Sequence, residues 1–534
     1  MPKVKPDRNG DATYDGIGQT VHDPLVRDLL STPAARRTAE ILISGFNFHT
    51  HPLNTHTRLD HLFGTSRRMS ELIDALNSHQ SRAVIEVPQI KNLLAMTATH
   101  DLGHLPFSHT LEGLVHFHEG LVHDDISALI VEGKLDYMWY RTEHPRVFFP
   151  GNPNSGSGYI ASVEAWMSLQ PMLTNLKSVP DILARHGIER SLVVQVLSDK
   201  IAAKLGYGHL ARENRIYRQL MNGALFDVDK VDNMERDSFL ARDPKFSFDF
   251  DRLFGALKVV EYPSNCMALA IREESLPSLK KCVRIRKRMF QEMYTKKDFL
   301  VYEAMLIDAV SRTYGAFKRN EIELYFLNDD DLINLLKAHG GAEVQEHLLL
   351  MDVMKGAVTF SEAFSIKAEK TEDAGGKRNL TQKKFEITRD YAMLNTVYAF
   401  IDWAKKNYPS EFPVDVIRRN IYERAYKKSP GIKEHQILVR MPYIYRAEEE
   451  WISDLEDDLL VIPVGGVSSR RPLPLKTIPQ ISRERGGIAT SIMQIYCQPK
   501  AHNYFLVYSR GADEDIVNRA ASQFIKEIPK IIGK

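Results

Sequence analysis

The stretch that most constrains this chain is THDLGHLPFSH, which runs from Thr99 to His109 and ends an apolar segment of helical periodicity. Its adjacent His100 and Asp101 can place an imidazole nitrogen and a carboxylate oxygen on one cation. Such a ligand pair suits Mn, Fe, Zn or Mg. Because charges are costly to bury without a partner, the fold has to bring further ligands to this pair.

The same stretch carries two more histidines. A spacing of four residues predicts that His104 shares a helix face with His100. Pro106 is then expected to end the helix and to leave His109 on a loop. A His-Asp dipeptide also arises by chance, and histidines often satisfy hydrogen bonds in a protein core. The choice between these readings depends on ligands from the rest of the chain.

A second polar pattern lies in LFDVDKVDNMERDSFLARD. Its polar residues recur at helical spacing, namely Asp229, Asp232, Asn233, Arg236 and Asp237. The spacing predicts one continuous polar stripe along a helix. A polar stripe is often a solvated face, but apolar residues flank this one on other sides. We therefore expect a buried helix whose carboxylates require cations.

Three further segments have informative helical patterns. HPLNTHTRLDHLFG predicts a long helix that begins with a variant capping box of Thr57 and Asp60. Arg58 and His61 then share one face of this helix. VHDDISALIVEG predicts a helix headed by His123. KKCVRIRKRMFQEMYTKK is strongly basic, which fits either a solvated amphipathic helix or a wall of positive charge for a polyphosphate.

The length of the chain predicts more than one lobe. Its 534 residues exceed the roughly 250 to 300 residues that one hydrophobic core usually includes. We expect a mainly α fold with a flexible tail over residues 1–20, a helical core over 21–340 and a smaller C-terminal α+β lobe over 341–534. Short β-type runs such as NYFLVYSRG support the last assignment.

Charge and cysteine usage restrict the cellular setting. There are 70 Lys and Arg residues against 69 Asp and Glu residues, so the formal charge of +1 gives no global reason to expect nucleic acid or a membrane. The three cysteines are isolated, and no apolar run resembles a signal peptide or a membrane span. We expect a cytoplasmic protein without a membrane partner.

Taken together, HTRLDH, HDLGHLPFSH, HDDIS and DVDKVDNMERD resemble the HD-domain deoxynucleoside triphosphate triphosphohydrolases. The likeness extends from about residue 21 to the tail. The family includes bacterial dGTPases and a vertebrate enzyme with an added sterile-alpha-motif domain, which we do not expect here. The resemblance implies an HD-domain helical core that hydrolyses these nucleotides at the α-phosphorus and releases intact triphosphate.

The resemblance also implies a metal site and a reaction site. The divalent metal would be held by His61, His100, Asp101 and Asp229. Arg58 and His109 would contact the α-phosphate, and His104 and His123 would lie beside the scissile bond. We prefer His123 to His118 for this role because HDDIS fits the spacing of the family.

The remaining substrate contacts follow from the same resemblance. Lys230 and Arg286 would bind phosphates, while Asp237 and Tyr294 would contact the sugar. Asn233 stands where the family has a tyrosine, and Ile43 with Ser44 replaces a glutamine-leucine pair at the sugar edge. These departures keep ribonucleotides, a signalling nucleotide or nucleic-acid ends open as alternative substrates.

Partners are predicted less directly. A nucleoside triphosphate is the expected substrate, and a homo-oligomer is expected because members of the family commonly form one. Ser31, Ala39 and Glu274 occupy the positions that bind an activating nucleotide in the vertebrate enzyme, so an activator site here would be lost or built differently. A nucleotide-binding or nucleic-acid-binding sensor is the alternative class, and the basic run from Arg284 to Arg288 is the feature that supports it.

Overall fold

A computed structural model gives the fold of most of the chain. The described residues are 13–14, 20–21, 23–49, 51–78, 84–114, 120–137, 177–223, 225–262, 266–294, 297–319, 323–353, 360–367, 389–440, 459–462, 473–474, 503–511 and 513–533. The predicted tail lies almost entirely outside this set. So does His118.

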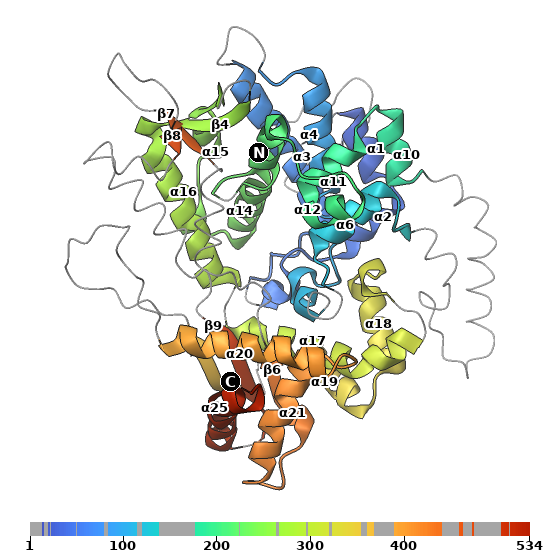
Figure 1. Ribbon diagram of the computed structural model, residues 1–534, viewed down its shortest axis with the longest axis vertical. Helices are drawn as coiled ribbons and strands as arrows, with labels where there is room; N and C mark the ends of the chain where they lie inside the picture. The colour runs from blue at the N-terminus through green and yellow to red at the C-terminus, as the bar shows by residue number, and fades with distance from the viewer. Residues whose placement is uncertain are drawn as a thin grey trace, which may run out of the picture.

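The first part of the molecule is a helical body (Figure 1). Its main helices are α1 (Pro24–Leu30), α2 (Pro33–Arg37), α3 (Arg58–Ser78), α4 (Val87–Thr99), α6 (His123–Glu132), α10 (Val179–Arg185), α11 (Arg190–Leu197), α12 (Asp199–Lys204), α13 (Arg215–Met221), α14 (Val228–Ala241), α15 (Phe250–Phe254) and α16 (Leu276–Met289). Helices α3 and α4 pack against each other, and α14 packs on α3. This packing places the three segments singled out in the sequence side by side.

Local capping explains where several of these helices begin. Thr32 accepts a hydrogen bond from the Ala35 N–H, and Pro33 follows it at the first helical position, where its missing N–H costs nothing. Before α3, Asp60 accepts from the Thr57 N–H at 2.9 Å and thereby closes the predicted capping box. Asp227 caps α14 through the Lys230 N–H at 2.7 Å.

A small mixed sheet lies at one edge of this body. Its strands are β3 (Leu257–Glu261), β4 (Met267–Arg272), β7 (Leu460–Ile462) and β8 (Leu473–Pro474), in the order β3-β4-β7-β8. Strand β7 pairs in parallel with β4, whereas the other pairs are antiparallel. The late part of the chain therefore returns to the first body.

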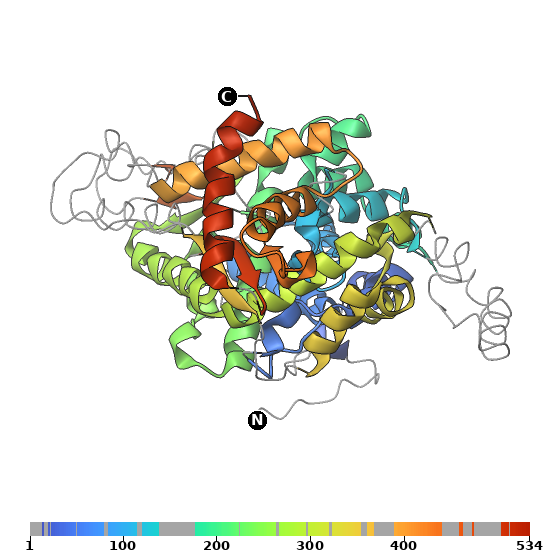
Figure 2. The same ribbon diagram turned by 90° about the horizontal axis from the view of Figure 1, so that it is seen from below.

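The second part is an α+β assembly below the first (Figures 1 and 2). It contains α17 (Lys297–Arg319), α18 (Asp329–His339), α19 (Ala342–Val353), α20 (Arg389–Asn407), α21 (Pro413–Tyr426), α25 (Glu514–Ile531) and the antiparallel sheet β5 (Ser361–Lys367), β9 (Asn503–Ser509) and β6 (Ile437–Arg440). In Figure 2, the terminal helix α25, in red, crosses the lower face against α20 and α21.

Buried charges join the helices of the second part. Asp308 on α17 pairs with Arg418 of α21, with Arg312 at 2.7 Å and with His347 of α19 at 2.9 Å. The neighbouring guanidinium of Arg418 helps to hold the pKa of Asp308 below its usual range, although burial alone would raise it. The cluster therefore fixes three helices in one arrangement.

The predicted mainly α fold with small sheets is confirmed. One hydrophobic cluster runs from Leu25 in α1 to Ile528 in α25 and includes residues of both parts. No helix among the described residues has the length and apolar character needed to cross a membrane. The domain boundary at residue 340 stays a prediction.

Candidate metal centre

Three helices supply the residues of the predicted metal set. His61 lies in the first turn of α3, and Asp229 lies in the first turn of α14. His100 and Asp101 directly follow the end of α4. Because α3 packs between the other two helices, the four side chains meet in one place.

The ring nitrogens and carboxylate oxygens of this set lie close together. His61 Nε2 is 2.9 Å from Asp229 Oδ1, 3.5 Å from Asp101 Oδ2 and 3.3 Å from His100 Nε2. His100 Nε2 is 3.5 Å from Asp101 Oδ1 and 3.7 Å from Asp229 Oδ1. Atoms at these separations can bind one ion together, and the mixed nitrogen and oxygen set suits a divalent cation.

Hydrogen bonds on the far side of each imidazole fix the ring orientation. His61 Nδ1 lies 2.7 Å from Asp232 Oδ2, and His100 Nδ1 lies 2.9 Å from the Thr97 carbonyl oxygen. Both partners accept a hydrogen bond from the Nδ1–H group, so each Nε2 faces the centre. Metal-bound histidines usually have such an outer partner.

The electrostatics of the set also fit a cation. Burial disfavours charge on His61, but the carboxylates of Asp229 and Asp232 outweigh it and raise its pKa to about 9. Burial would likewise raise the pKa of Asp229, yet His100 and His61 hold it well below its usual range. A divalent cation would take the place of these bound protons and satisfy the same carboxylates.

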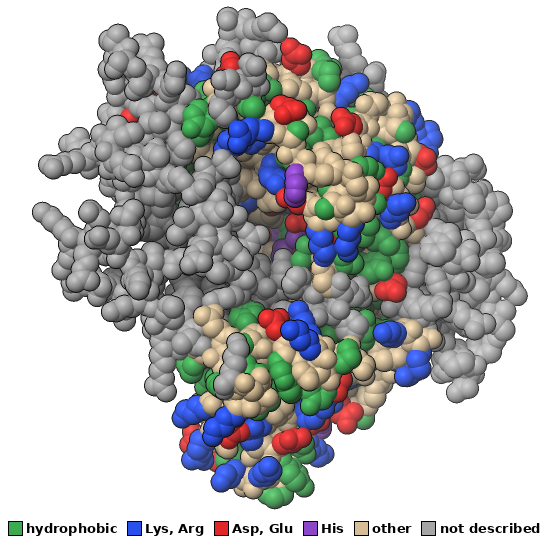
Figure 3. All heavy atoms as spheres, in the orientation of Figure 1, with side chains coloured by type: hydrophobic (Ala, Val, Ile, Leu, Met, Phe, Trp, Pro, Cys, Tyr) green, Lys and Arg blue, Asp and Glu red, His purple; other side chains and the backbone are tan. Residues whose placement is uncertain are grey.

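A second cluster of three histidines adjoins the metal set. His104, His109 and His123 have ring nitrogens within 4.8 Å of one another. The rings of His104 and His123 stack with centroids 4.1 Å apart. His104 is 1% exposed, and its Nδ1 has no hydrogen-bond partner. Figure 3 shows histidine side chains reaching the surface near the middle of one face of the molecule.

Glu112 orients two of these histidines. Its carboxylate accepts from His109 Nδ1 at 2.6 Å and from His123 Nδ1 at 2.5 Å. Burial disfavours charge on His123, but Asp124 and Glu112 outweigh it and raise the pKa to about 10. No role was predicted for Glu112 from the sequence, although its position three residues after His109 indicates a contact between the two side chains.

Asp101 and Arg58 connect the two clusters. Asp101 Oδ1 lies 3.3 Å from His104 Nε2, while Asp101 Oδ2 pairs with Arg58 Nη1 at 2.6 Å. Arg58 Nε also donates to Ser108 Oγ at 3.1 Å. The metal set and the histidine cluster therefore share one carboxylate.

One prediction about this segment is wrong. Helix α4 ends at Thr99, seven residues before Pro106, so His100 and His104 do not share a helix face. The cause is the close approach of Gly103 to α6, where an added Cβ would overlap the backbone at His123 and Ser127. His104 reaches Asp101 through a turn instead, in which its N–H donates to the Asp101 carbonyl oxygen.

The residues predicted to contact the sugar and the phosphates lie on α14, on α16 and in the turn after α16. The Tyr294 hydroxyl, in a π-helical turn over residues 290–294, donates to Asp237. Burial raises the pKa of Asp237 to about 6, although that hydrogen bond lowers it. Asn233 Nδ2 donates to Asp229 Oδ1 at 2.8 Å, which places the amide beside the metal set.

Two expected phosphate ligands have other contacts. The Lys230 ammonium pairs with Asp227, the residue that caps α14. The Arg286 guanidinium lies over the Phe290 ring, 5.7 Å from its centroid. Neither contact brings these groups against the metal donors, so their roles as phosphate ligands stay predictions.

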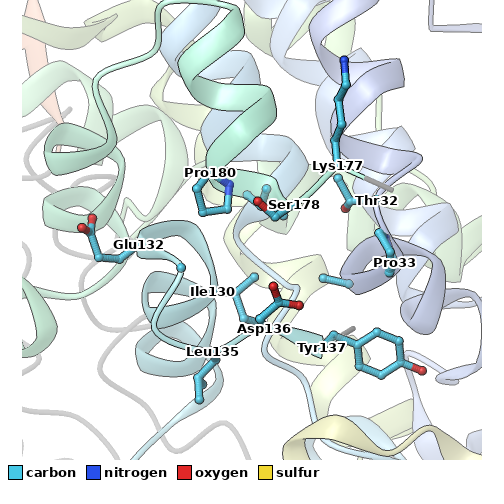
Figure 4. Close-up of a pocket in the computed structure, with 13 residues that line it drawn as sticks. Thr32, Pro33, Ile130, Glu132, Leu135, Asp136, Tyr137, Lys177, Ser178 and Pro180 are labelled. Carbon is cyan, nitrogen blue, oxygen red and sulfur yellow. The ribbon is translucent and has the colours of Figure 1, made fainter. Parts of the chain in front are cut away.

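A separate cavity of about 320 Å³ opens between α2, the end of α6 and the start of α10 (Figure 4). Thr32, Glu132, Tyr137 and Pro180 are among its lining residues. None of the candidate site residues lines this cavity.

The closeness of α3 and α14 leads to a prediction about metal binding. At Gly64, an added Cβ would overlap the side chains of Asp232 and Arg236. Gly64→Ala should displace Asp232 from His61 and weaken metal binding by about 10- to 100-fold. Calorimetric titration with Mn²⁺ measures this change.

Gly315→Ala is the matched control. This glycine lies inside α17, and the nearest atom to an added Cβ is Arg319 Nη1 at 3.7 Å, an ordinary contact. Its metal affinity should equal that of the native chain. An unchanged affinity in Gly64→Ala would contradict the orienting role of Asp232.

Comparison with known proteins gives distant relatives. No protein-family model matches the chain. It is 22% identical over 326 residues to the uncharacterized protein MG461 of Mycoplasma genitalium, a match that covers 60% of this chain and 64% of that protein. It is 22% identical over 324 residues to human deoxynucleoside triphosphate triphosphohydrolase SAMHD1, over 59% of this chain and 44% of that enzyme.

A shorter match has higher identity. The chain is 32% identical over 91 residues to SAMHD1 of Danio rerio, which is 17% of this chain and 15% of that protein. The matches to MG461 and to the human enzyme each span less than two thirds of the relative. The chain thus has a distant similarity to the deoxynucleoside triphosphate triphosphohydrolases, and its His-Asp cluster is compatible with a divalent metal.

Proposed function

We propose that this chain is a metal-dependent hydrolase that cleaves deoxynucleoside triphosphates into deoxynucleoside and inorganic triphosphate. One observation carries the proposal, namely that a four-residue donor set adjoins a histidine cluster and shares Asp101 with it. The distant similarity to SAMHD1 supplies the substrate class.

The proposed metal ligands are His61, His100, Asp101 and Asp229. When bound, a divalent cation such as Mn, Fe, Zn or Mg would lower the pKa of a water molecule and polarise a phosphoryl oxygen. The ligand set does not select among these four metals. The carboxylates of Asp101 and Asp229 carry the negative charge that such an ion neutralises.

The histidine cluster would protonate the leaving group. His123 carries a raised pKa, so it holds a proton at neutral pH and can donate it to the departing 5′-oxygen. Glu112 keeps that ring and the His109 ring aimed at the same region. His104 Nε2 faces Asp101, and its Nδ1 would contact an α-phosphate or β-phosphate oxygen.

Basic and polar residues would bind the rest of the nucleotide. Arg58, held between Asp101 and Ser108, faces the α-phosphate in this proposal. Lys230 and Arg286 would bind the outer phosphates after leaving their present contacts. Asp237, Tyr294 and Asn233 would contact the sugar. A homo-oligomer, a nucleotide activator and a cytoplasmic location stay predictions.

The test is product analysis on each of the four deoxynucleoside triphosphates with Mn²⁺ or Mg²⁺. Inorganic triphosphate and free nucleoside should appear in equal amounts. In ¹⁸O-labelled water, attack at the α-phosphorus places the label in triphosphate, whereas attack at the 5′-carbon places it in the nucleoside. Absence of triphosphate with every substrate and both metals would refute the proposal.

A second candidate is the same reaction on ribonucleotides. Beside Asp237 lie Asn54 and His56, which are 2% and 8% exposed. His56 Nε2 is 3.4 Å from Asp237 Oδ1, and His56 Nδ1 has no hydrogen-bond partner. Buried polar atoms of this kind usually bind something, and a second sugar hydroxyl would suit them. Faster triphosphate release from ribonucleoside than from deoxynucleoside triphosphates would favour this candidate.

A further inference from the structure

Two buried charged side chains outside the site contact the backbone of the histidine segment. Arg37 at the end of α2 is 4% exposed, and Asp329 at the start of α18 is 8% exposed. Burial lowers the pKa of Arg37 to about 10 and raises the pKa of Asp329 to about 7. Burying these two polar side chains has a desolvation cost, which calls for an explanation.

Arg37 holds the turn that follows α4. Its Nη2 donates to the carbonyl oxygens of Leu102 and His104, each at 2.8 Å, and its Nη1 donates to the carbonyl oxygen of Leu327 at 2.6 Å. Leu102 and His104 lie beyond the end of the helix, where carbonyl groups have no helical partner. One guanidinium therefore fixes the backbone on both sides of Gly103.

Asp329 holds the other end of the segment. Its Oδ1 accepts from the Phe107 N–H at 2.6 Å, and its Oδ2 accepts from the Leu42 N–H at 3.0 Å. Leu42 in turn forms a β-bridge with Thr57, and its carbonyl oxygen accepts from Ser108 Oγ at 2.6 Å. The carboxylate thus connects the loop to the β-bridge of Leu42 and Thr57 that precedes α3.

The backbone at the Asp329 anchor has an unusual conformation. Phe107 and Ser108 have φ values of 55° and 56°, in the left-handed region that residues with a side chain seldom adopt. Such conformations persist where the surroundings hold them. The Phe107 ring stacks on Phe46 at 4.7 Å, which is a third restraint on the same turn.

We propose that Arg37 and Asp329 are positioning residues, which hold residues 102–108 so that His104 and His109 face His123 across the reaction site. The inference rests on the proposed function for the meaning of the histidine cluster. Leu327 and Asp329 belong to the second part of the molecule, so their contacts also join that part to the reaction site. Figure 1 shows α18 below α2.

The test compares Asp329→Asn with Asp330→Asn and Arg37→Met with Arg36→Met. Asp330 and Arg36 are the exposed neighbours on the same helices and serve as matched controls. An asparagine amide can accept from only one of the two N–H groups, and methionine cannot donate to a carbonyl. Each test variant should lose about 10- to 100-fold in kcat for triphosphate release, as small misplacements of reacting groups do.

Three further readouts separate positioning from loss of folding. Manganese content should match that of the control variants, and each test variant should stay folded at the assay temperature although its unfolding temperature falls. Hydrogen exchange, followed by mass spectrometry, should become faster in a peptide covering residues 104–110 and stay unchanged in one covering residues 332–339. Unchanged exchange in the first peptide would overturn the inference, as would a kcat loss that follows the loss of metal or of folded protein.

The exchange experiment does not depend on the reaction. If the native chain releases no triphosphate, the proposed function fails while the exchange pattern still decides whether the two residues hold the loop. If triphosphate is released and both variants retain full kcat, the positioning role fails alone.

Discussion

Asp229→Ala is expected to abolish both metal binding and triphosphate release. Asp229 Oδ1 lies 2.9 Å from His61 Nε2 and 3.7 Å from His100 Nε2, so its removal opens one side of the donor set. Metal activation of water and of the phosphoryl group contributes several kcal/mol, so the rate should fall by roughly 10³-fold or more. Elemental analysis after dialysis against Mn²⁺ and ion chromatography of triphosphate measure the two effects.

Asp243→Ala is the control for this variant. Asp243 lies just beyond the end of α14 and pairs with Lys245 at 2.9 Å, away from the donor set. It should retain one metal and native activity. Full metal content in Asp229→Ala would remove this residue from the ligand set, and full activity without bound metal would refute metal dependence altogether.

Some of the site could be predicted because local spacing determines it. The capping pair of Thr57 and Asp60 starts α3 so that Arg58 and His61 project from its first turn. Part of the polar stripe of α14 is buried, with Asp232 and Arg236 both inaccessible and paired at 3.0 Å, whereas Asp229 and Asn233 are partly exposed. A helical repeat fixes such positions without knowledge of the rest of the fold.

Other features depend on contacts between distant segments. The packing of Gly103 against α6 determines where α4 ends. The prediction from Pro106 alone therefore put the end of this helix too far along the chain. The parallel pairing of β7 with β4 joins residues almost two hundred positions apart, which no local pattern reveals. Glu112 acquires its second histidine partner, His123, only when α6 docks beside the loop.

The proposed roles of the histidines depend most on Glu112, and Glu112→Gln is expected to slow the reaction while leaving the metal in place. His109 Nδ1 and His123 Nδ1 donate to different oxygens of Glu112, and glutamine replaces one of these oxygens with an NH₂ group that cannot accept. General acid catalysis typically contributes about 10²- to 10⁴-fold, and the loss of kcat should fall in this range. Glu343→Gln, on the exposed side of α19, is the control.

The pH profile gives this prediction its sharpest form. The carboxylates of Asp124 and Glu112 raise the pKa of His123 to about 10 against the effect of burial, so in the native chain its proton is present at neutral pH and is lost only as the pH rises through that value. Removing the Glu112 charge lowers this pKa, and the alkaline limb of the kcat profile should move to lower pH. An alkaline limb that stays in place while kcat falls would mean that Glu112 orients the rings but that His123 is not the proton donor.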